Sequence, residues 1–479
     1  MKRSTKLSPR PPKTPALPPE TPTKSKKSKK ELASSSAVRR AISTMRPRSD
    51  RQSERAGIPS DFELTREFST AFDLLERTKH HYYVTGNAGT GKSTLLHYFK
   101  EKTQKKTVVL APTGIAAVNI GGSTIHSFFR FPTRLITLDD VKKIRGKADL
   151  FTALETLVID EVSMVRADMM DAIDASLRLN RNRPYDPFGG VQLVLIGDLF
   201  QLPPVVERDL GEYFEDNYVT PYFFSAKVFS KIRLQKIELQ HVFRQNDPEF
   251  ILLLNKVRNK EVDLSDLEKI NQRHQPSLKF NTHDLAITLT STNALASAIN
   301  LQRLSALPSQ EYDFDAVIEG DFDEKSHPTD KKLKLRKGAQ VMMVKNDPNK
   351  RWVNGTLGVI QYISNDSIKV SFGSVVHTIE QTSWEKSVYE YDRTYRSIES
   401  VVTGSFHQYP IKLAWAITIH KSQGKTFDNV IINLGYGAFA HGQAYVALSR
   451  CRSYEGVYLN APLKYSDIIL DPRVRDFHM

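Results

Sequence analysis

A glycine-rich octapeptide at residues 86–93 constrains this chain more than any other feature of its sequence. It reads Gly-Asn-Ala-Gly-Thr-Gly-Lys-Ser and matches the pattern G-x-x-x-x-G-K-[ST] of a phosphate-binding loop. An apolar stretch at residues 82–85 precedes it and a stretch with helical character follows from about Lys92. Backbone N–H groups of such a loop, together with the N-terminus of the next helix, cradle phosphates. The sequence therefore predicts an α/β domain that binds a nucleotide.

The lysine and serine of this loop have predictable roles. We expect Lys92 to pair with the β- and γ-phosphates and Ser93 to ligate Mg²⁺. An apolar strand that ends in a carboxylate should stand beside the loop, and residues 157–161, Leu-Val-Ile-Asp-Glu, supply one. Asp160 would hold Mg²⁺ through water, and Glu161 is a candidate general base for the attacking water.

The adjacent acidic pair indicates an ATPase that hydrolyses its nucleotide. Signalling GTPases position water with a glutamine, and small-molecule kinases need no water. A third apolar stretch ends at Asp198, and Gln201 follows it closely enough to sense the γ-phosphate. Taken by itself, Gln201 is equally well explained as a turn residue.

Positive charge is concentrated at one end of the chain. Residues 1–57 hold 16 of the 68 Lys and Arg residues, 4 of the 54 Asp and Glu residues and 8 of the 24 prolines. Such a segment cannot bury enough apolar surface to offset its chain entropy, so we predict a disordered basic tail. The lysine-rich run at residues 24–30 has three alternative interpretations: a phosphate contact, a targeting signal or part of a solvated tail. The remainder is nearly neutral, so the overall charge does not argue for nucleic-acid binding.

The sequence also limits the cellular setting. Its single cysteine, Cys451, excludes an internal disulfide and fits a reducing compartment. No run of 18 or more apolar residues is present, so no membrane span is expected. The N-terminus lacks the apolar region of a secretory signal.

Apolar strands alternate with helical stretches, which favours α/β layers built on parallel sheets. A helical pattern carries Phe68 and Leu75. Residues from about 359 to 409 differ, because short β-type stretches such as residues 367–372 indicate a small all-β insertion. The expected strands lie at residues 82–85, 108–111, 156–159, 191–196, 286–289, 340–344 and 429–433.

Seven segments in order resemble the motifs of a known family. They match motifs I, Ia, II, III, IV, V and VI of the Pif-one-like helicases, which belong to superfamily one, subclass B, and are related to RecD. The resemblance covers about residues 60–465. The segments are residues 86–94, 111–117, 159–164, 197–204, 242–245, 416–424 and 445–450.

The resemblance implies two tandem RecA-like parallel-sheet domains with ATP in the cleft between them. The first core would span residues 58–233, with a small wedge insertion at about 118–150. The second would span 234–479, with a small β-barrel insertion at about 359–409. Arg244 and Arg450 resemble the family's arginine fingers, which come from the second core. The implied nucleotide-binding residues are Gly86, Asn87, Ala88, Gly89, Thr90, Gly91, Lys92, Ser93, Thr94, Gln423 and Gly424.

The same resemblance implies contacts to a DNA strand on the face opposite the ATP cleft. Hydroxyl, imidazole and ammonium groups suit phosphate oxygens and carry no base code. Phe128 has two alternative roles, stacking on a base or packing in the core. The implied strand contacts are Pro112, Thr113, Gly114, Ser123, Thr124, His126, Ser127, Phe128, His420, Lys421 and Ser422.

The implied activity is that of an ATP-dependent, Mg²⁺-dependent DNA helicase that moves 5′ to 3′ on single-stranded DNA in DNA replication, repair, recombination or telomere maintenance. Its partners would be single-stranded and forked DNA, and by extension RNA–DNA hybrids or G-quadruplexes. We expect a monomer in the bacterial cytoplasm, or in the nucleus or mitochondrion of a eukaryote. The alternatives are a RecD-like translocase and an ATP-gated clamp, neither of which unwinds DNA.

One position departs from the family pattern. Phe68 stands where the family often has a glutamine that reads adenine. Phe68 packs instead, or a nearby residue reads the base, so the sequence predicts ATP binding but not strict selection of ATP over other nucleotides.

Overall fold

The computed structural model describes residues 64–275 and 285–478, which belong to one compact unit at Ala56–Met479. The predicted basic tail at residues 1–57 lies outside the described residues. In the part of the chain that the structure describes, no helix has both the length and the apolar character needed to cross a bilayer.

The first core is a six-stranded parallel sheet with the order β3-β2-β4-β5-β1-β6. The central strands β4 and β5 are buried along their whole length, which is why they read as unbroken apolar runs in the sequence. The predicted strands at residues 82–85, 108–111, 156–159 and 191–196 are all present in it. The strands are β1 (His81–Gly86), β2 (Thr107–Ala111), β3 (Ser123–Thr124), β4 (Thr156–Ile159), β5 (Gln192–Ile196) and β6 (Leu234–Leu239).

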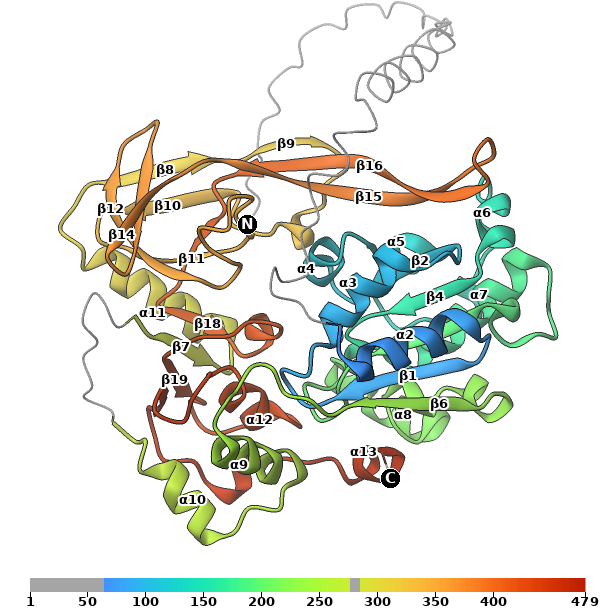
Figure 1. Cartoon of the computed structure of the whole chain (residues 1–479), viewed down its shortest axis with the longest axis horizontal. Helices are drawn as coiled ribbons and strands as arrows, with labels where there is room; N and C mark the ends of the chain where they lie inside the picture. The colour runs from blue at the N-terminus through green and yellow to red at the C-terminus, as the bar shows by residue number, and fades with distance from the viewer. Residues whose placement is uncertain (1–63, 276–284, 479) are drawn as a thin grey trace, which may run out of the picture. The chain divides into compact units, whose positions relative to one another are not determined.

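Helices cover both faces of this sheet (Figure 1). Phe68 and Leu75 of α2 pack on one face with Val84 of β1, as the helical pattern predicted. Ile173 of α7 packs on the other face with Leu193 of β5. The helices are α2 (Arg66–Arg77), α3 (Lys92–Lys102), α4 (Gly114–Asn119), α5 (Ile125–Phe129), α6 (Ala148–Ala153), α7 (Ala167–Arg181) and α8 (Gly211–Tyr218).

The second core is a smaller parallel sheet with the order β18-β7-β19-β20. Two parallel sheets flanked by helices confirm the predicted pair of RecA-like domains. The predicted boundary after residue 233 differs from the strand pairing, because β6 pairs with β1 along its full length. The elements are β7 (Ile287–Thr290), β18 (Ala416–Thr418), β19 (Val430–Asn433), β20 (Val457–Leu459), α9 (Pro248–Asn259), α10 (Leu264–Asn271), α11 (Asn293–Ser305) and α12 (Gln443–Leu448). The last helix, α13 (Pro472–His478), packs on the first core instead, where Phe477 stacks on Phe224.

Antiparallel strands fill residues 311–413, a longer stretch than the predicted insertion at 359–409. They form three sheets, and closure into a barrel stays a prediction. The stretch at 340–344 is a strand as predicted, but it pairs antiparallel with β12 and β17 and lies outside the parallel layers. The strands are β8 (Glu311–Asp315), β9 (Val317–Gly320), β10 (Lys332–Arg336), β11 (Gln340–Met343), β12 (Leu357–Ile363), β13 (Ile368–Phe372), β14 (Val375–Ile379), β15 (Thr382–Asp392), β16 (Ser397–Gln408) and β17 (Ile411–Leu413).

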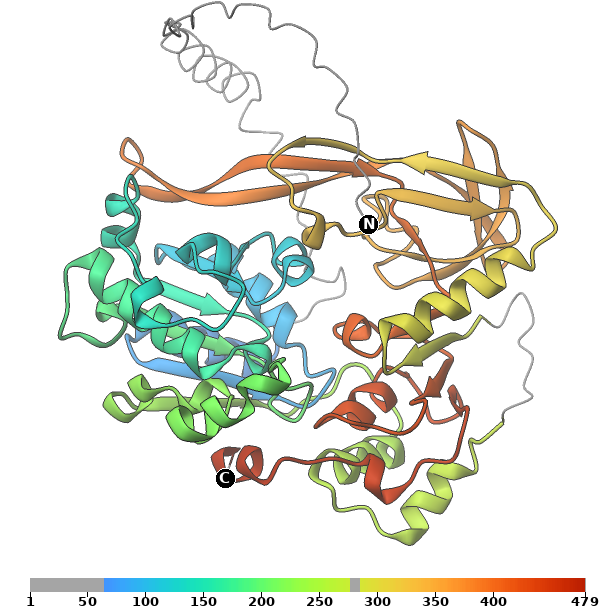
Figure 2. The same ribbon diagram turned by 180° about the vertical axis from the view of Figure 1, so that it is seen from behind.

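Strands β15 and β16 form a long hairpin arm that lies against the first core. Figure 2 shows the arm from behind, running from the antiparallel sheets toward α6. The Tyr389 hydroxyl accepts the N–H of Val109 in β2, and the Ser123 hydroxyl donates to the carbonyl of Ser387 at 2.7 Å. The arm therefore contacts the segment in which several strand-binding residues are predicted.

Candidate nucleotide-binding cleft and strand-binding face

The phosphate-binding loop joins β1 to α3 and depends on glycine at three positions. Gly86, Gly89 and Gly91 have φ values of 148°, 87° and 81°, which side chains other than hydrogen rarely allow. A Cβ on Gly91 would come within 2.7 Å of the Phe68 ring, and one on Gly86 within 2.4 Å of the Leu239 carbonyl oxygen. The loop is thus packed so tightly against its neighbours that only glycine fits at these positions.

Lys92 is partly buried and folded back over its own loop. Its Nζ donates to the carbonyl oxygens of Gly86 at 2.8 Å and Asn87 at 2.9 Å. Burial lowers the pKa of Lys92 to about 8, although the negative charges of Asp198 and Glu161 oppose that shift. The two carbonyl oxygens offer this ammonium only partial negative charges. A phosphate anion beside it would supply a full negative charge.

Asp160 and Glu161 follow β4 directly and face the same cleft. Burial raises the pKa of Asp160 to about 7, with the neighbouring charge of Glu161 adding to the shift, and burial also raises the pKa of Glu161. Glu161 has a left-handed backbone, with φ 50° and ψ 43°, a strained conformation that is common at functional sites. Asp160 is buried and Glu161 partly buried, and two carboxylates that resist ionisation suit a site that receives a cation.

The oxygen donors of this cleft fit Mg²⁺. Ser93 offers a hydroxyl and Asp160 a carboxylate, and Mg²⁺ prefers oxygen ligands with several positions left to water and phosphate. Within residues 64–275 and 285–478, no cluster of three or more His, Cys, Asp or Glu side chains is placed to hold a metal. A magnesium ion here would therefore need the phosphates of the nucleotide to complete its coordination.

Gln201 lies at the predicted strand end but is held there by neighbours. It is buried, and its amide donates to Asp198 at 3.2 Å. The amide of Gln423 reaches the Gln201 oxygen from the second core at 3.5 Å, so the structure brings these two predicted residues together. Gly424, next in the chain, is exposed.

A buried ion pair beside Gln201 was not foreseen from the sequence. Arg258 of α9 donates to Asp198 at 3.2 Å, and its guanidinium carbon lies 3.6 Å from the centroid of the Phe200 ring. Although burial raises the pKa of Asp198, the charges of Arg258 and Lys92 hold it below its usual value. This pair links the first sheet to α9, because each partner comes from a different side of the cleft.

Arg244 reaches the loop from the segment that leaves β6. The Phe243 N–H donates to the Gly89 carbonyl at 2.9 Å, and Arg244 donates to the Ser449 carbonyl at 3.1 Å. Arg244 therefore lies on the connection between the two sheets, outside the body of the second sheet. Burial lowers its pKa, and the nearby charge of Arg450 adds to the effect.

Arg450 follows α12 and is almost completely buried. It donates to the Val446 carbonyl at 2.9 Å and to the Ser449 hydroxyl at 2.8 Å. Burial lowers its pKa, while Glu161 is close enough to oppose the shift. Lys92 and the two carboxylates of the first core thus share one cleft with Arg244 and Arg450, and the three cations together favour a phosphate anion.

Tyr445 is a further cleft residue that sequence reasoning passed over. It lies on α12, and its hydroxyl accepts the N–H of Ala88, the third residue of the phosphate loop, at 2.9 Å. Burial raises its pKa to about 12, so the hydroxyl keeps its proton. A hydroxyl that accepts one hydrogen bond can still donate one, which suits a phosphate oxygen.

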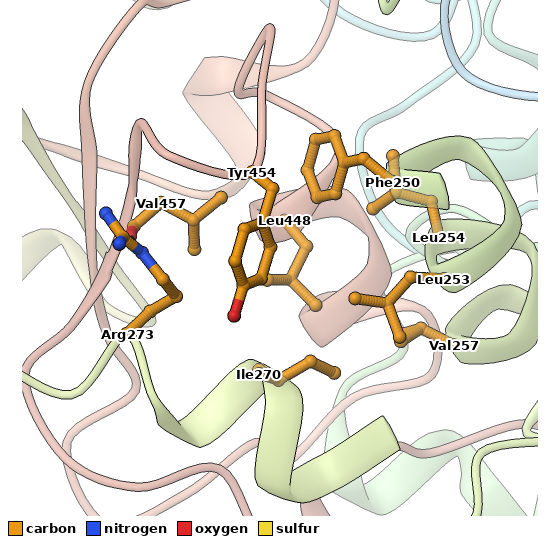
Figure 3. Close-up of a pocket in the computed structure, with 9 residues that line it drawn as sticks. All are labelled: Phe250, Leu253, Leu254, Val257, Ile270, Arg273, Leu448, Tyr454 and Val457. Atoms are coloured by element: carbon orange, nitrogen blue, oxygen red, sulfur yellow. The ribbon is translucent and has the colours of Figure 1, made fainter. Parts of the chain in front are cut away.

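Apolar packing behind α12 fixes the helix that carries Tyr445 (Figure 3). The space there is about 10 Å³, room for about one water and far too small for a nucleotide. It is part of the core that positions α12. The side chains that line it are Phe250, Leu253, Leu254, Val257, Ile270, Arg273, Leu448, Tyr454 and Val457.

The predicted strand contacts of the first core follow β2 and β3. The hydroxyls of Thr113 and Thr124 cap α4 and α5 by accepting N–H groups at 3.3 and 3.1 Å. Ser123 is buried and donates to the hairpin arm, so its hydroxyl is engaged within the protein. Ser127 is exposed. Pro112, Gly114 and His126 are partly exposed in the same segment.

The second-core contacts follow β18 in a short 3₁₀ turn at His420–Ser422. Lys421 is exposed and His420 partly exposed, whereas Ser422 is buried and donates to the Ile419 carbonyl at 2.7 Å. Lys421 and His420 are therefore accessible to a strand as the chain stands, and Ser422 is not.

Phe128 packs in an aromatic cluster. Only 3% of it is exposed, and its ring centroid lies 4.8 Å from Phe129, 5.4 Å from Phe151 and 6.2 Å from Tyr389. This burial favours the core alternative for Phe128. Stacking on a base stays a prediction that requires the cluster to open.

Known proteins are similar to this chain in sequence and in fold. The model of the PIF1-like helicase family matches residues 63–268, and that of the DNA helicase Pif1 2B domain matches 324–363. The ATP-dependent DNA helicase Pif1 of Bdellovibrio bacteriovorus is 32% identical over 428 residues, which cover 87% of this chain and 92% of that protein. The chain belongs to the PIF1-like helicase family.

Mammalian relatives in this family are longer. The mouse ATP-dependent DNA helicase PIF1 is 35% identical over 396 residues, which cover 78% of this chain. The chain spans a little over half of the mouse and rat proteins, 56% and 58% of their lengths.

Solved PIF1-like helicases have the same fold. The unliganded Pif1 of a Bacteroides species superposes with a TM-score of 0.80 at 39% identity, covering 87% of this chain and 97% of that one. The same protein in complex with ADP-AlF4 gives a TM-score of 0.80, with the same identity and coverage.

Phe68, the departure from the PIF1-like pattern, packs under the phosphate loop. It is 1% exposed, and its ring lies 5.9 Å from that of Phe243. A phenyl ring has no hydrogen-bonding group, so Phe68 cannot recognise adenine through a hydrogen bond. The neighbouring Glu67 accepts the N–H of Gln240 at 2.7 Å with one carboxylate oxygen.

Replacing Tyr445 by phenylalanine tests the role of its hydroxyl. We expect Tyr445→Phe to lower kcat for ATP hydrolysis about tenfold with little change in KM, since one hydrogen bond to a charged group contributes about 1.5–3 kcal/mol. Tyr454→Phe is the matched control, because that hydroxyl donates to the Lys269 carbonyl away from the cleft. Steady-state hydrolysis that falls equally in both variants would contradict a specific role for Tyr445.

Proposed function

We propose that this chain is an ATP-dependent DNA helicase that translocates 5′ to 3′ on single-stranded DNA and unwinds duplex or structured DNA. The observation that carries the proposal is the cleft in which Lys92 and Glu161 of the first core meet Arg450 of the second. Membership of the PIF1-like helicase family supports the activity. RRM3 of Saccharomyces cerevisiae, 28% identical over 495 residues, is also an ATP-dependent DNA helicase.

The chemistry follows from the side chains in the cleft. Glu161 takes a proton from water as the water attacks the γ-phosphorus of ATP. Lys92, Arg244 and Arg450 stabilise the charge that develops on the phosphoryl oxygens. When bound, a magnesium ion held by Ser93 and, through water, by Asp160 supplies further positive charge beside the phosphates.

Contacts across the cleft convert this chemistry into motion. Asn87 of the phosphate loop donates to Asn255 of α9 at 2.8 Å, and Tyr445 accepts from Ala88. A change in the phosphates therefore changes contacts that join the two cores. Because hydrolysis removes the γ-phosphate, it weakens the closed cleft and lets the cores separate.

The nucleic-acid partner is inferred from relatives and from accessible donors. Bacteroides Pif1 has been solved bound to single-stranded DNA, and another structure concerns unwinding at forked double-stranded DNA by two coordinating Pif1 helicases. We propose single-stranded and forked DNA as partners here, contacted by Thr113, Ser127, His420 and Lys421. RNA–DNA hybrids and G-quadruplexes extend this proposal.

We propose that the chain acts as a monomer inside the cell. Roles in replication, repair, recombination or telomere maintenance follow from the proposed activity. A RecD-like translocase or an ATP-gated clamp would share the cleft but would not separate strands.

Strand displacement on three DNA substrates tests the function. Forked, 5′-tailed and 3′-tailed duplexes should be incubated with the protein, ATP and Mg²⁺. We expect the forked and 5′-tailed duplexes to be unwound and the 3′-tailed duplex to stay intact. Unwinding of the 3′-tailed duplex alone would contradict the polarity, and ATP hydrolysis with no displacement would favour the translocase or clamp.

Deleting residues 1–57 tests the basic tail, which lies outside the described residues. The deletion removes 16 basic and 4 acidic residues and so most of the net charge of +14. We expect unchanged ATP hydrolysis at saturating DNA and weaker DNA binding at low salt, since phosphate contacts release counterions. Equal affinity of both proteins across a salt titration would show that the tail does not bind phosphates.

A further inference from the structure

A cationic hollow lies in the first core, on the segment between α5 and α6. Its volume is about 490 Å³, and Arg130, Lys142, Lys143 and Arg145 contribute its charge. No role in the ATP cleft or in the predicted strand contacts involves these four residues. The complete lining is Phe129, Arg130, Phe131, Pro132, Asp140, Lys142, Lys143, Ile144 and Arg145.

The positive charge of the hollow is not neutralised by nearby acids. Among the residues that the structure describes, none of its four cations forms a salt bridge. Its one carboxylate, Asp140, is already bound by two guanidinium nitrogens of Arg134, at 2.6 and 2.9 Å. That contact holds the pKa of Asp140 at about 2. The hollow therefore offers four cations to an external anion.

Helix α7 holds this segment in one conformation. Asp168 accepts the N–H of Ile136 at 2.9 Å, and Asn180 accepts the N–H of Ile144 at 2.7 Å. Both acceptors are buried, as are the two isoleucine side chains. A backbone fixed at two buried points loses little further entropy when a ligand binds, so the backbone positions that carry the cations are preorganised.

The aromatic residues of the hollow indicate which form of nucleic acid it suits. Phe129 and Phe131 stack on each other at 5.3 Å and are 3% and 6% exposed, so neither presents a face to a base. Single strands are commonly held by stacking on exposed aromatic rings. Cations without such rings instead contact sugar–phosphate backbone, and duplex DNA carries its phosphates at about one charge per 1.7 Å of axis.

We propose that the cationic hollow binds the phosphate backbone of double-stranded DNA and holds the duplex arm of a fork beside the motor. The proposal rests on the proposed function for its biological meaning, but the binding itself needs neither ATP nor unwinding. The hollow adds a duplex contact to the strand contacts predicted near the cleft.

Substitution of three cations tests the proposal. In the full chain, Lys142→Ala, Lys143→Ala and Arg145→Ala are combined, and binding to a blunt 20-base-pair duplex and to a single-stranded oligonucleotide is measured by fluorescence anisotropy at several salt concentrations. We expect duplex affinity to fall at least about tenfold at low salt. The slope of log affinity against log salt should fall by about 2 to 3, at about 0.9 for each phosphate that the protein no longer neutralises. Single-strand affinity should be unchanged.

A second triple variant controls for bulk charge. Lys79, Lys231 and Arg233 are also exposed on or beside the first core, so their combined replacement by alanine removes the same charge. Duplex affinity should remain near that of the unaltered chain in this variant. The proposal is overturned if both triple variants lose the same duplex affinity, if the hollow variant keeps the original salt slope, or if it loses single-strand affinity to the same extent. Failure of the unaltered chain to unwind a fork, with the duplex affinities of the variants as expected, would count against the proposed function and leave the duplex contact standing.

Discussion

Glu161→Gln should abolish ATP turnover while leaving ATP and DNA binding intact. The substitution keeps the shape of a partly buried side chain but removes the base that accepts the proton of the attacking water. General base catalysis contributes about 10²- to 10⁴-fold, so kcat should fall by at least about 100-fold. Steady-state hydrolysis with single-stranded DNA measures the loss, and fluorescent-nucleotide and oligonucleotide binding measure what is retained.

Folding is not expected to explain this loss. Burial disfavours the ionised form of Glu161 and raises its pKa, so a neutral amide at this position should not lower the unfolding midpoint. Asp174→Asn, which alters a carboxylate paired with Arg178 on α7, is the comparison for charge removal elsewhere in the core. Hydrolysis by Glu161→Gln near the rate of the unaltered chain would show that another group is the base.

Arg244→Ala should reduce kcat about 1,000-fold or more, with a smaller effect on ATP binding. An arginine that stabilises the transferring phosphoryl group contributes about 10³- to 10⁵-fold. Arg244 meets this requirement because its backbone lies against Gly89 and its guanidinium reaches Ser449 across the cleft. The measurement is single-turnover hydrolysis at saturating ATP and single-stranded DNA.

Arg450 requires a gentler substitution because its guanidinium binds buried carbonyl oxygens. Arg450→Lys keeps the charge and loses the forked geometry, and we expect a comparable fall in kcat. The exposed Arg233→Ala serves as the control. If Arg244→Ala and Arg233→Ala hydrolyse ATP equally well, Arg244 does not act as an arginine finger.

The phosphate loop and the acidic strand end were predictable because their chemistry is local. A strand, a glycine turn and a helix follow one another in residues 81–102, so a short pattern contains the whole phosphate cradle. Asp160 and Glu161 likewise follow β4 without interruption. Their pairing with Lys92 needs only that parallel strands end at the same edge of the sheet.

Contacts between distant residues were not predictable in the same way. Asp198 and Arg258 are 60 residues apart, and nothing local to either indicates a buried ion pair. Tyr445 belongs to a recognisable motif, but its bond to Ala88 joins residues 357 positions apart. Tertiary packing also determines the environments of Phe128 and Ser123. The hairpin arm, which lies far along the chain, covers Phe128 and accepts a hydrogen bond from Ser123.

The antiparallel region illustrates a further limit. The stretch at 340–344 is as apolar as the parallel strands, and all four residues of β11 are buried. Its composition therefore does not distinguish a parallel partner from an antiparallel one. Its partners β12 and β17 lie at the two ends of the predicted insertion, so the pairing extends the antiparallel region well before residue 359.

Stimulation of ATP hydrolysis by single-stranded DNA tests the central claim most directly. The claim is that one cleft, built from two cores, hydrolyses ATP to move along a strand. The rate should be measured for the unaltered chain with and without a single-stranded oligonucleotide, with Glu161→Gln as the background. We predict a many-fold rise on addition of DNA and no rise for the variant. Equal rates with and without the strand would contradict the account.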